Sequence, residues 1–331
     1  MLTGWIPRFK ADRPLDDWER DHPLPLDWSQ RMSPDDSISM VKFNSVFIEF
    51  VDRTFKVKGM AHMLVNGLGF MFFLIFLPVG TALFWEADGS FFSNMLPVFV
   101  FAPICIGSAA AFWWLYLRHD AFQYKYYPVR FNCRTRKIYV FRHNGPDGVL
   151  TIPWGNPYAY FHIGQGKHSG KFYDLRCHLL DSNGEVRETF TVGHFWDHEN
   201  RVRETWELIR RYMQDGPADC FDHPGDRVIT LSTRMSWENA WLMVCLMMGT
   251  NLYPLRWNLM FPVYGLLTLS RWLTMKSCRS PVFPPEIEAE CAIDPDDRYR
   301  LPEPSFMAEF AEDKMIYARS EERLRERQRW E

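Results

Sequence analysis

One glycine- and lysine-rich stretch has the residue types of a phosphate-binding loop. It reads Gly-Gln-Gly-Lys-His-Ser-Gly-Lys over residues 164–171. Gly164 lies one residue too early for the phosphate-loop spacing, and Phe172 stands where Ser or Thr would reach magnesium. The stretch also leads into a strand pattern, so it offers no helix N-terminus to a phosphate. We therefore expect a hairpin loop, with three basic residues as candidate contacts for anionic lipid headgroups: Lys167, His168 and Lys171.

Two further groups of residues could hold a metal ion. His194 and His198 are four residues apart, as on one face of a helix. However, His194 precedes the expected helix N-cap, Asp197, and no cysteine or carboxylate cluster completes the set. Cys220 and His223 follow a Gly-Pro break, and no nucleophile-elbow or zinc-protease motif occurs. The sequence predicts no metal site, no cofactor and no enzymatic activity.

The net charge and the cysteine pattern argue against two other classes of protein, nucleic-acid-binding proteins and disulfide-stabilised proteins. The formal net charge is −3, so nucleic acid is not an implied partner. The seven cysteines are scattered without a Cys-x-x-Cys pair, which indicates reduced thiols instead of a disulfide framework. They are Cys105, Cys133, Cys177, Cys220, Cys245, Cys278 and Cys291.

Two long apolar segments lie next to each other near the N-terminal third. Residues 60–85 and 91–117 carry no Asp, Glu, Lys or Arg, and only five residues separate them. Since about 20 helical residues cross a bilayer core, they predict a transmembrane helical hairpin over 59–117. Basic residues flank the hairpin on both sides but are absent from its loop, so we expect both termini to be cytoplasmic. The first residues lack the apolar stretch of a signal peptide, so we expect the first membrane helix to direct insertion.

After the hairpin the hydrophobic period changes to two, which predicts strands. The residues at 173, 175, 177 and 179 are apolar and alternate with Asp174, Arg176 and His178, as in a half-buried strand. An amphipathic helix follows at about 198–214, with Trp206 and Ile209 on its apolar stripe and Gly216-Pro217 at its end. The expected strands are 127–133, 137–142, 149–154, 158–163, 171–180 and 185–192.

This order of strands and one C-terminal helix resembles a pleckstrin-homology-like barrel. The segments 129–142 and 148–154 look like the paired opening strands of bacterial membrane-anchored domains of that kind. The resemblance implies a nearly closed antiparallel sheet over 118–216 on the cytosolic side of the membrane. The overall expectation is an α+β membrane protein.

The remaining segments are less regular. Residues 1–58 form an expected N-terminal cytosolic arm, in which 41–58 could be a strand or a short amphipathic helix. Three tryptophans of the arm are candidate partner-binding residues: Trp5, Trp18 and Trp28. A second apolar helical hairpin at 240–275, within a block at 217–280, is either re-entrant or membrane-spanning. Residues 281–331 form a charged tail.

The complete order resembles an uncharacterised family of proteobacterial membrane proteins encoded beside type VI secretion effectors. It comprises the Trp-rich arm, hairpin, barrel, second apolar block and Pro-Pro-Glu-Ile-Glu at 284–288. This resemblance implies a non-enzymatic inner-membrane binding protein, with the lipid bilayer and a cognate toxin as partners. An alternative is a lipid-sensing or scaffolding protein unrelated to a toxin.

Overall fold

The computed structural model describes most of the chain outside the first apolar hairpin. The described residues are 9–60, 103, 107–108, 110–111, 120–145, 147–166, 172–248 and 261–307. The chain divides into two compact units. The first comprises 1–57, 124–243 and 280–331, and the second comprises 58–123 and 244–279.

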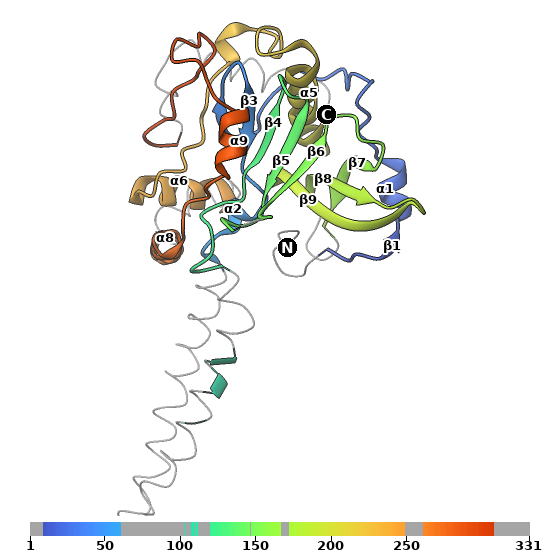
Figure 1. The fold of residues 1–331 in the computed structure, drawn as a ribbon. Helices are drawn as coiled ribbons and strands as arrows, with labels where there is room; N and C mark the ends of the chain where they lie inside the picture. Colours follow the sequence, from blue (N-terminus) through green and yellow to red (C-terminus); the bar gives the residue numbers. More distant parts are fainter. Residues whose placement is uncertain are drawn as a thin grey trace, which may run out of the picture. The chain divides into compact units, whose positions relative to one another are not determined.

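The first unit contains two antiparallel sheets (Figure 1). The five-stranded sheet has the order β2-β3-β4-β5-β6, and the four-stranded sheet has the order β1-β9-β8-β7. The strands of the larger sheet are β2 (Met40–Phe43), β3 (Phe47–Phe50), β4 (Val129–Asn132), β5 (Lys137–Phe141) and β6 (Val149–Pro153). Those of the smaller sheet are β1 (Arg13–Pro14), β7 (Ala159–Gln165), β8 (Tyr173–Leu180) and β9 (Glu185–Trp196).

One apolar core joins both sheets to helix α5 (Glu199–Asp215). Successive side chains of a strand point to opposite faces, so alternate residues of each strand enter this core. Phe131 represents the larger sheet and Leu175 the smaller one, and both are fully buried. Trp206 and Ile209 of α5 are also fully buried there, which confirms their predicted inward orientation.

The outer face of each sheet is covered as well. The arm with α1 (Asp17–Asp21) lies on the smaller sheet, whose edge strand β7 bonds to residues 22–24. Helix α9 (Pro285–Glu290) lies over the larger sheet in Figure 1, and Phe283 and Cys291 beside it join a second apolar cluster with Phe47 and Phe141. Each sheet is therefore covered over part of its outer face, which carries polar residues and, on the larger sheet, the apolar residues of the second cluster.

The remaining described elements are short or belong to the second unit. They are α2 (Thr54–Val57), the 3₁₀ helix η2 (Pro224–Asp226), α6 (Trp237–Met248) and α8 (Phe261–Ser277). Within the second unit, the buried Arg271 of α8 donates from Nη1 to the carbonyl oxygen of Lys58 at 3.0 Å. Gly59 has a φ of +89°, and a Cβ there would lie 2.4 Å from the Arg271 Cα, so only glycine fits this crossing.

The strands predicted between 127 and 192 and the helix α5 are confirmed, but the predicted single barrel is wrong. The strands β4, β5 and β6 instead extend a sheet that begins with β2 and β3, whose residues come from the N-terminal arm. The pattern at 41–58 therefore contains two strands followed by the short helix α2. Local periodicity identifies a strand but not its partner, and this pairing bridges about 80 residues of sequence.

The predicted α+β membrane fold is also contradicted. No helix among the described residues has the length and apolar character needed to cross a membrane. Helices α6 and α8, from the second apolar block, have 12 and 17 residues, fewer than the roughly 20 that a bilayer core requires. The hairpin predicted over 59–117 lies almost entirely outside the described residues.

Candidate metal centre

The outer face of the smaller sheet brings two histidines together. On β7, Phe161 and Ile163 point into the core, so His162 between them points to the opposite face. The same alternation places His178 of β8 on that outer face. Tyr160 pairs with His178 across the two strands, which makes His162 its diagonal neighbour. The two imidazole centroids are 4.3 Å apart.

A carboxylate reaches this face from the N-terminal arm. Glu19 is the third residue of α1, and its backbone N–H donates to Asp16 Oδ1 at 2.9 Å. Asp16 N–H donates in return to Glu19 Oε2 at 3.0 Å, which completes a capping box. Tyr160 Oη donates to the Glu19 carbonyl at 2.8 Å, and Trp18 Nε1 donates to the Ile163 carbonyl at 2.9 Å. These bonds fasten α1 directly over β7.

Glu19 is itself held by a guanidinium and an imidazole. Arg13 Nη1 donates to Oε2 at 2.7 Å, and Arg13 Nη2 donates to Oε1 at 2.6 Å. His178 Nε2 lies 3.0 Å from Oε1, while its Nδ1 lies 2.7 Å from Thr189 Oγ1. Burial raises the pKa of Glu19, but the bonds from Arg13 and His178 outweigh it and hold the pKa well below its usual range. The carboxylate is therefore ionised.

His162 differs from its neighbours because neither ring nitrogen is hydrogen-bonded. The residue is 0% exposed, and among the described residues neither Nδ1 nor Nε2 has a partner with hydrogen-bond geometry. Burial, followed by the charges of His178 and Arg176, lowers the pKa of His162 to about 3, against weaker opposition from Glu19 and the Ile163 backbone. The ring is therefore neutral at physiological pH, with a lone pair available to a ligand. Such a buried, unsatisfied polar group costs about 1–3 kcal/mol in the absence of a partner.

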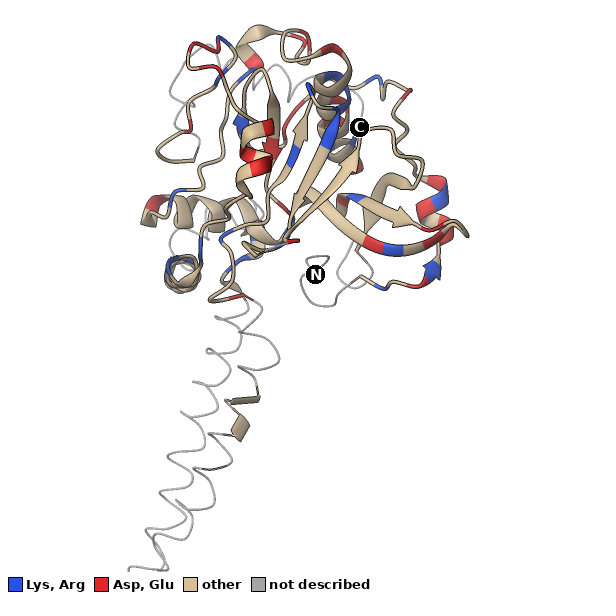
Figure 2. Cartoon of the chain, viewed as in Figure 1, with Lys and Arg blue, Asp and Glu red and all other residues tan. Residues whose placement is uncertain are grey.

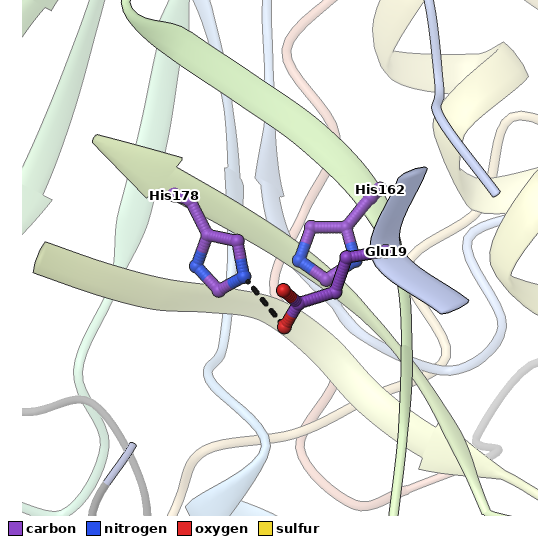
Figure 3. Close-up of side chains that lie close together, drawn as sticks. All are labelled: Glu19, His162 and His178. Atoms are coloured by element: carbon purple, nitrogen blue, oxygen red, sulfur yellow. Dashed lines mark hydrogen bonds and ion pairs between the residues drawn. The ribbon is translucent and has the colours of Figure 1, made fainter. Parts of the chain in front are cut away.

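Together the three side chains form a possible first coordination shell (Figure 3). One ligand atom from each of Glu19, His162 and His178 lies within 4.8 Å of the others, and all three residues are buried. Two imidazoles and a carboxylate suit zinc and also the iron(II) class of sites. Metal–ligand bonds of about 2.0–2.2 Å allow two ligand atoms of one ion to be at most ~4.4 Å apart, which is comparable to the spacing within this cluster.

The orientation of His178 is compatible with ligation. With no ion bound, His178 Nε2 carries the proton that it donates to the Glu19 carboxylate. Ligation requires the other tautomer, in which Nδ1 donates to Thr189 Oγ1 and Nε2 presents its lone pair to the ion. Arg13 competes for the same carboxylate, because Oε1 accepts from Arg13 Nη2. A metal ion would have to share Glu19 with this guanidinium or displace one of its two bonds.

Of the site residues suggested by the sequence, none that the structure describes belongs to this cluster. Lys167, His168, Lys171 and Trp5 lie outside the described residues. Trp18 packs within the arm, stacked on His22 with centroids 3.6 Å apart, whereas Trp28 is 73% exposed. His194 is buried on β9, and His198 is the N-cap of α5 in place of the expected Asp197.

The cluster was missed because its members are distant in sequence. Glu19 and His178 are 159 residues apart, and no motif links them. The alternation along β8 places His178 on the face opposite to the core residues, but nothing in the local pattern indicates that α1 covers that face.

The fold and the cluster together define an α+β protein with two sheets and a buried His-His-Glu group. The chain belongs to a family of unknown function, DUF6708, whose match spans residues 108–295, more than half of the sequence. The expected membership of an uncharacterised family is confirmed at that level, but this match contains no link to type VI secretion or to pleckstrin-homology-like domains. No curated protein and no solved structure matches the chain.

Proposed function

We propose that this protein binds a divalent transition metal ion through Glu19, His162 and His178, and that the ion fastens the N-terminal arm to the smaller sheet. The observation that carries the proposal is His162, a buried neutral imidazole with two unbonded nitrogens beside a second imidazole and an ionised carboxylate. A metal ion would supply the missing partner for one of those nitrogens.

A structural ion is favoured over a catalytic one by the burial of all three ligands. Glu19, His162 and His178 are each at most 3% exposed, so a substrate would have to displace α1 to reach an ion. The ligands also come from two elements, the arm and the sheet, that only the folded chain brings together. Binding free energy at such a site stabilises the folded state.

The test is a titration of the metal-stripped full chain with Zn²⁺ by calorimetry and with Co²⁺ by visible absorption. We expect one equivalent to bind, with cobalt bands typical of nitrogen and oxygen ligands and a rise in the melting temperature. His162→Leu should weaken binding by more than the roughly 10–100-fold that loss of an outer-shell partner causes. His223→Gln, at an exposed histidine outside the cluster, is the matched control.

Two results would reject the metal site. One is a folded wild-type chain that binds neither ion. The other is a folded His162→Leu variant that binds Co²⁺ with unchanged affinity and spectrum. Circular dichroism of each variant shows whether the fold is retained.

A second candidate function is non-enzymatic protein binding, with a toxin encoded beside this gene, such as a type VI secretion effector, as the partner. Its support is the family-level resemblance of the sequence and the position of Trp28, a large aromatic side chain of the arm that is 73% exposed. Exposed tryptophans are frequent energetic centres of protein interfaces.

Co-expression with the neighbouring effector in a sensitive host tests this second function. The full chain should protect the host, and Trp28→Ala should protect less well than Tyr158→Ala, a change at another exposed aromatic residue. Absence of protection by a full chain that is expressed and folded would reject it.

A further inference from the structure

The segment that carries Glu19 crosses the outer face of the smaller sheet from one side to the other. It comprises residues 12–23, all of which the structure describes, and we call it the strap. At its N-terminal end β1 pairs with β9, and the Asp12 N–H donates to the Val186 carbonyl at 2.7 Å. At its C-terminal end the His22 carbonyl accepts from the β7 backbone N–H of Ile163 at 3.0 Å. Since β8 lies between β9 and β7, the strap spans all three strands.

The strap buries little apolar surface. Seven of its twelve residues are Asp, Glu or Arg, and Figure 2 shows charges of both signs along the stretch that holds β1 and α1. Within the strap only Glu19 is buried, whereas Leu15 and Trp18 are half-buried. Apolar burial is the main favourable term in folding, so a segment of this kind has little hydrophobic free energy to lose when it leaves the sheet.

The polar contacts that hold the strap on the sheet are few and short. Strand β1 has two residues, and Pro14 has no N–H group to donate. The ion pair of Arg13 with Glu19 lies within the strap, so it stiffens the strap without attaching it to the sheet. Single bonds from Tyr160 and His178 to Glu19 provide attachment over β7 and β8. Each such bond contributes only modestly to stability, because water replaces it when the strap opens.

The chain is attached much more firmly directly after the strap. Leu24 is 2% exposed within the main core, and its N–H donates to the Phe161 carbonyl at 2.8 Å. Pro23 and Pro25 flank this residue, and each proline restricts both its own backbone and that of the residue before it. A boundary between a weakly held and a strongly held segment therefore lies at residues 23–24.

The strap covers the imidazoles of the metal cluster. His162 and His178 are each 0% exposed, and Thr189 beside them is 2% exposed. Glu19 belongs to the strap and the two histidines belong to the sheet, so movement of the strap would also separate the three ligands. An ion from solution reaches the buried ring nitrogens only after such a movement.

We propose that the strap opens and closes as a unit while the rest of the first unit stays folded, and that this motion admits and releases the metal ion. The role of the ion rests on the function proposed above, whereas the opening itself does not. The closed form offers the ion a carboxylate and two imidazoles, and the open form offers the imidazoles alone. Because the ion binds the closed form more tightly, it shifts the equilibrium toward closure.

Amide hydrogen exchange of the full chain, measured by mass spectrometry, tests the opening. After correction for intrinsic rates, strap peptides of the metal-free chain should exchange at least about tenfold faster than peptides of α5. Zn²⁺ at 100 times its calorimetric dissociation constant should slow the exchange of the strap by up to about 100-fold. Glu19→Gln should reduce this slowing, and Asp17→Asn is the matched control, since the Asp17 side chain is 94% exposed on the same helix.

Tyr160→Phe loosens the strap without removing a metal ligand. It deletes the hydroxyl group that donates to the Glu19 carbonyl at 2.8 Å. Exchange of the strap should become about 2–10-fold faster, as expected for one hydrogen bond. Release of Zn²⁺ to an excess of chelator should accelerate by a similar factor. Tyr158→Phe, at an exposed tyrosine directly before β7, is the matched control and should change neither rate.

The proposal is overturned if the strap of the folded metal-free chain exchanges no faster than α5, because the strap would then open only when the whole unit unfolds. It is also overturned if Zn²⁺ binds in the calorimeter but leaves the exchange of the strap unchanged. A chain that binds no Zn²⁺ while its strap exchanges faster than α5 would support the opening and reject the ion as its regulator, together with the metal site.

Discussion

The covered outer faces of the two sheets in the first unit both bury an ion pair, but they leave groups of opposite polarity without partners among the described residues. Each buries a glutamate against an arginine: Glu19 with Arg13 on the smaller sheet, and Glu49 with Arg130 on the larger sheet. On the smaller sheet, neither ring nitrogen of His162 has a partner among the described residues, and one of them carries a lone pair that can bind a cation. On the larger sheet, the group without a partner among the described residues is Arg130 Nη1, which is a hydrogen-bond donor. The two faces therefore differ in the polarity of the group that they leave unsatisfied.

The faces also differ in how their charges are assembled. Glu49 and Arg130 are opposite each other on adjacent strands, so the sheet itself sets their geometry. Glu19 is supplied by α1 and reaches His178 only when the arm is in place. We therefore expect changes that loosen the arm to affect metal binding and leave the Glu49–Arg130 pair intact.

The largest expected effect comes from breaking the pair on the larger sheet. Glu49→Gln leaves the guanidinium of Arg130 buried without its main counter-charge, which should lower the free energy of unfolding by about 3–5 kcal/mol. Urea denaturation measures the change, and the double variant with both residues changed to Met is the control. Equal destabilisation by the single and double variants would show that the charge imbalance is not the cause.

Low pH should weaken the attachment of the N-terminal arm, because the arm bonds to a third buried glutamate, Glu207 of α5. It accepts from Ser29 Oγ at 2.9 Å and from the Gln30 backbone N–H at 3.0 Å. Burial raises the pKa of Glu207, but Arg210, the Gln30 N–H and Arg211 lower it to about 2. Since the folded pKa is below the ordinary value near 4.5, this stabilisation is present above pH 4.5 and is lost as the pH falls toward 2.

The expected loss is at most about 3 kcal/mol, from 1.36 kcal/mol for each pKa unit. Unfolding free energies measured between pH 7 and pH 2.5 should show this loss. In the Glu207→Gln variant, the unfolding free energy should fall less over the same pH range. Glu185→Gln, a change in another glutamate of the unit, is the control. If the unfolding free energy of Glu207→Gln fell with pH as steeply as that of the wild type, Glu207 would not be the group responsible.

A smaller effect should follow from removing the hydroxyl that orients His178. Thr189→Val deletes the Oγ1 partner of Nδ1, which should cost about 1 kcal/mol of stability. It should also reduce metal affinity about 10–100-fold, because the imidazole loses its outer-shell partner. Unchanged metal affinity would place the ion elsewhere.

The smallest expected effect is that of Trp28→Ala. The side chain is 73% exposed, so the free energy of unfolding should change by no more than about 0.5 kcal/mol. In contrast, Trp206→Ala in the fully buried core should cost about 3–5 kcal/mol. Thermal denaturation of both variants provides the comparison, and a large loss in Trp28→Ala would show that this indole packs on the fold.

Much of the local structure could be predicted from the sequence because it depends on short-range patterns. The period of two from 127 to 192 identified β4 to β9, and the stripe with Trp206 and Ile209 identified α5. Pairing could not be predicted, since β3 meets β4 across a long sequence separation. The apolar character of 240–275 suggested membrane contact, yet it contains the helices α6 and α8, and Thr268 and Arg271 of α8 are buried.

The sequence by itself determined which residues alternate along each strand and therefore that His178 and Arg130 have the face opposite to their apolar neighbours. Only the tertiary structure decided that this opposite face is buried, because α1 covers one sheet and α9 the other. Burial changes the chemistry of these side chains: in water each unused nitrogen would be hydrated, whereas under a covering segment it lacks a partner. A ligand can satisfy that need, and only long-range packing creates it.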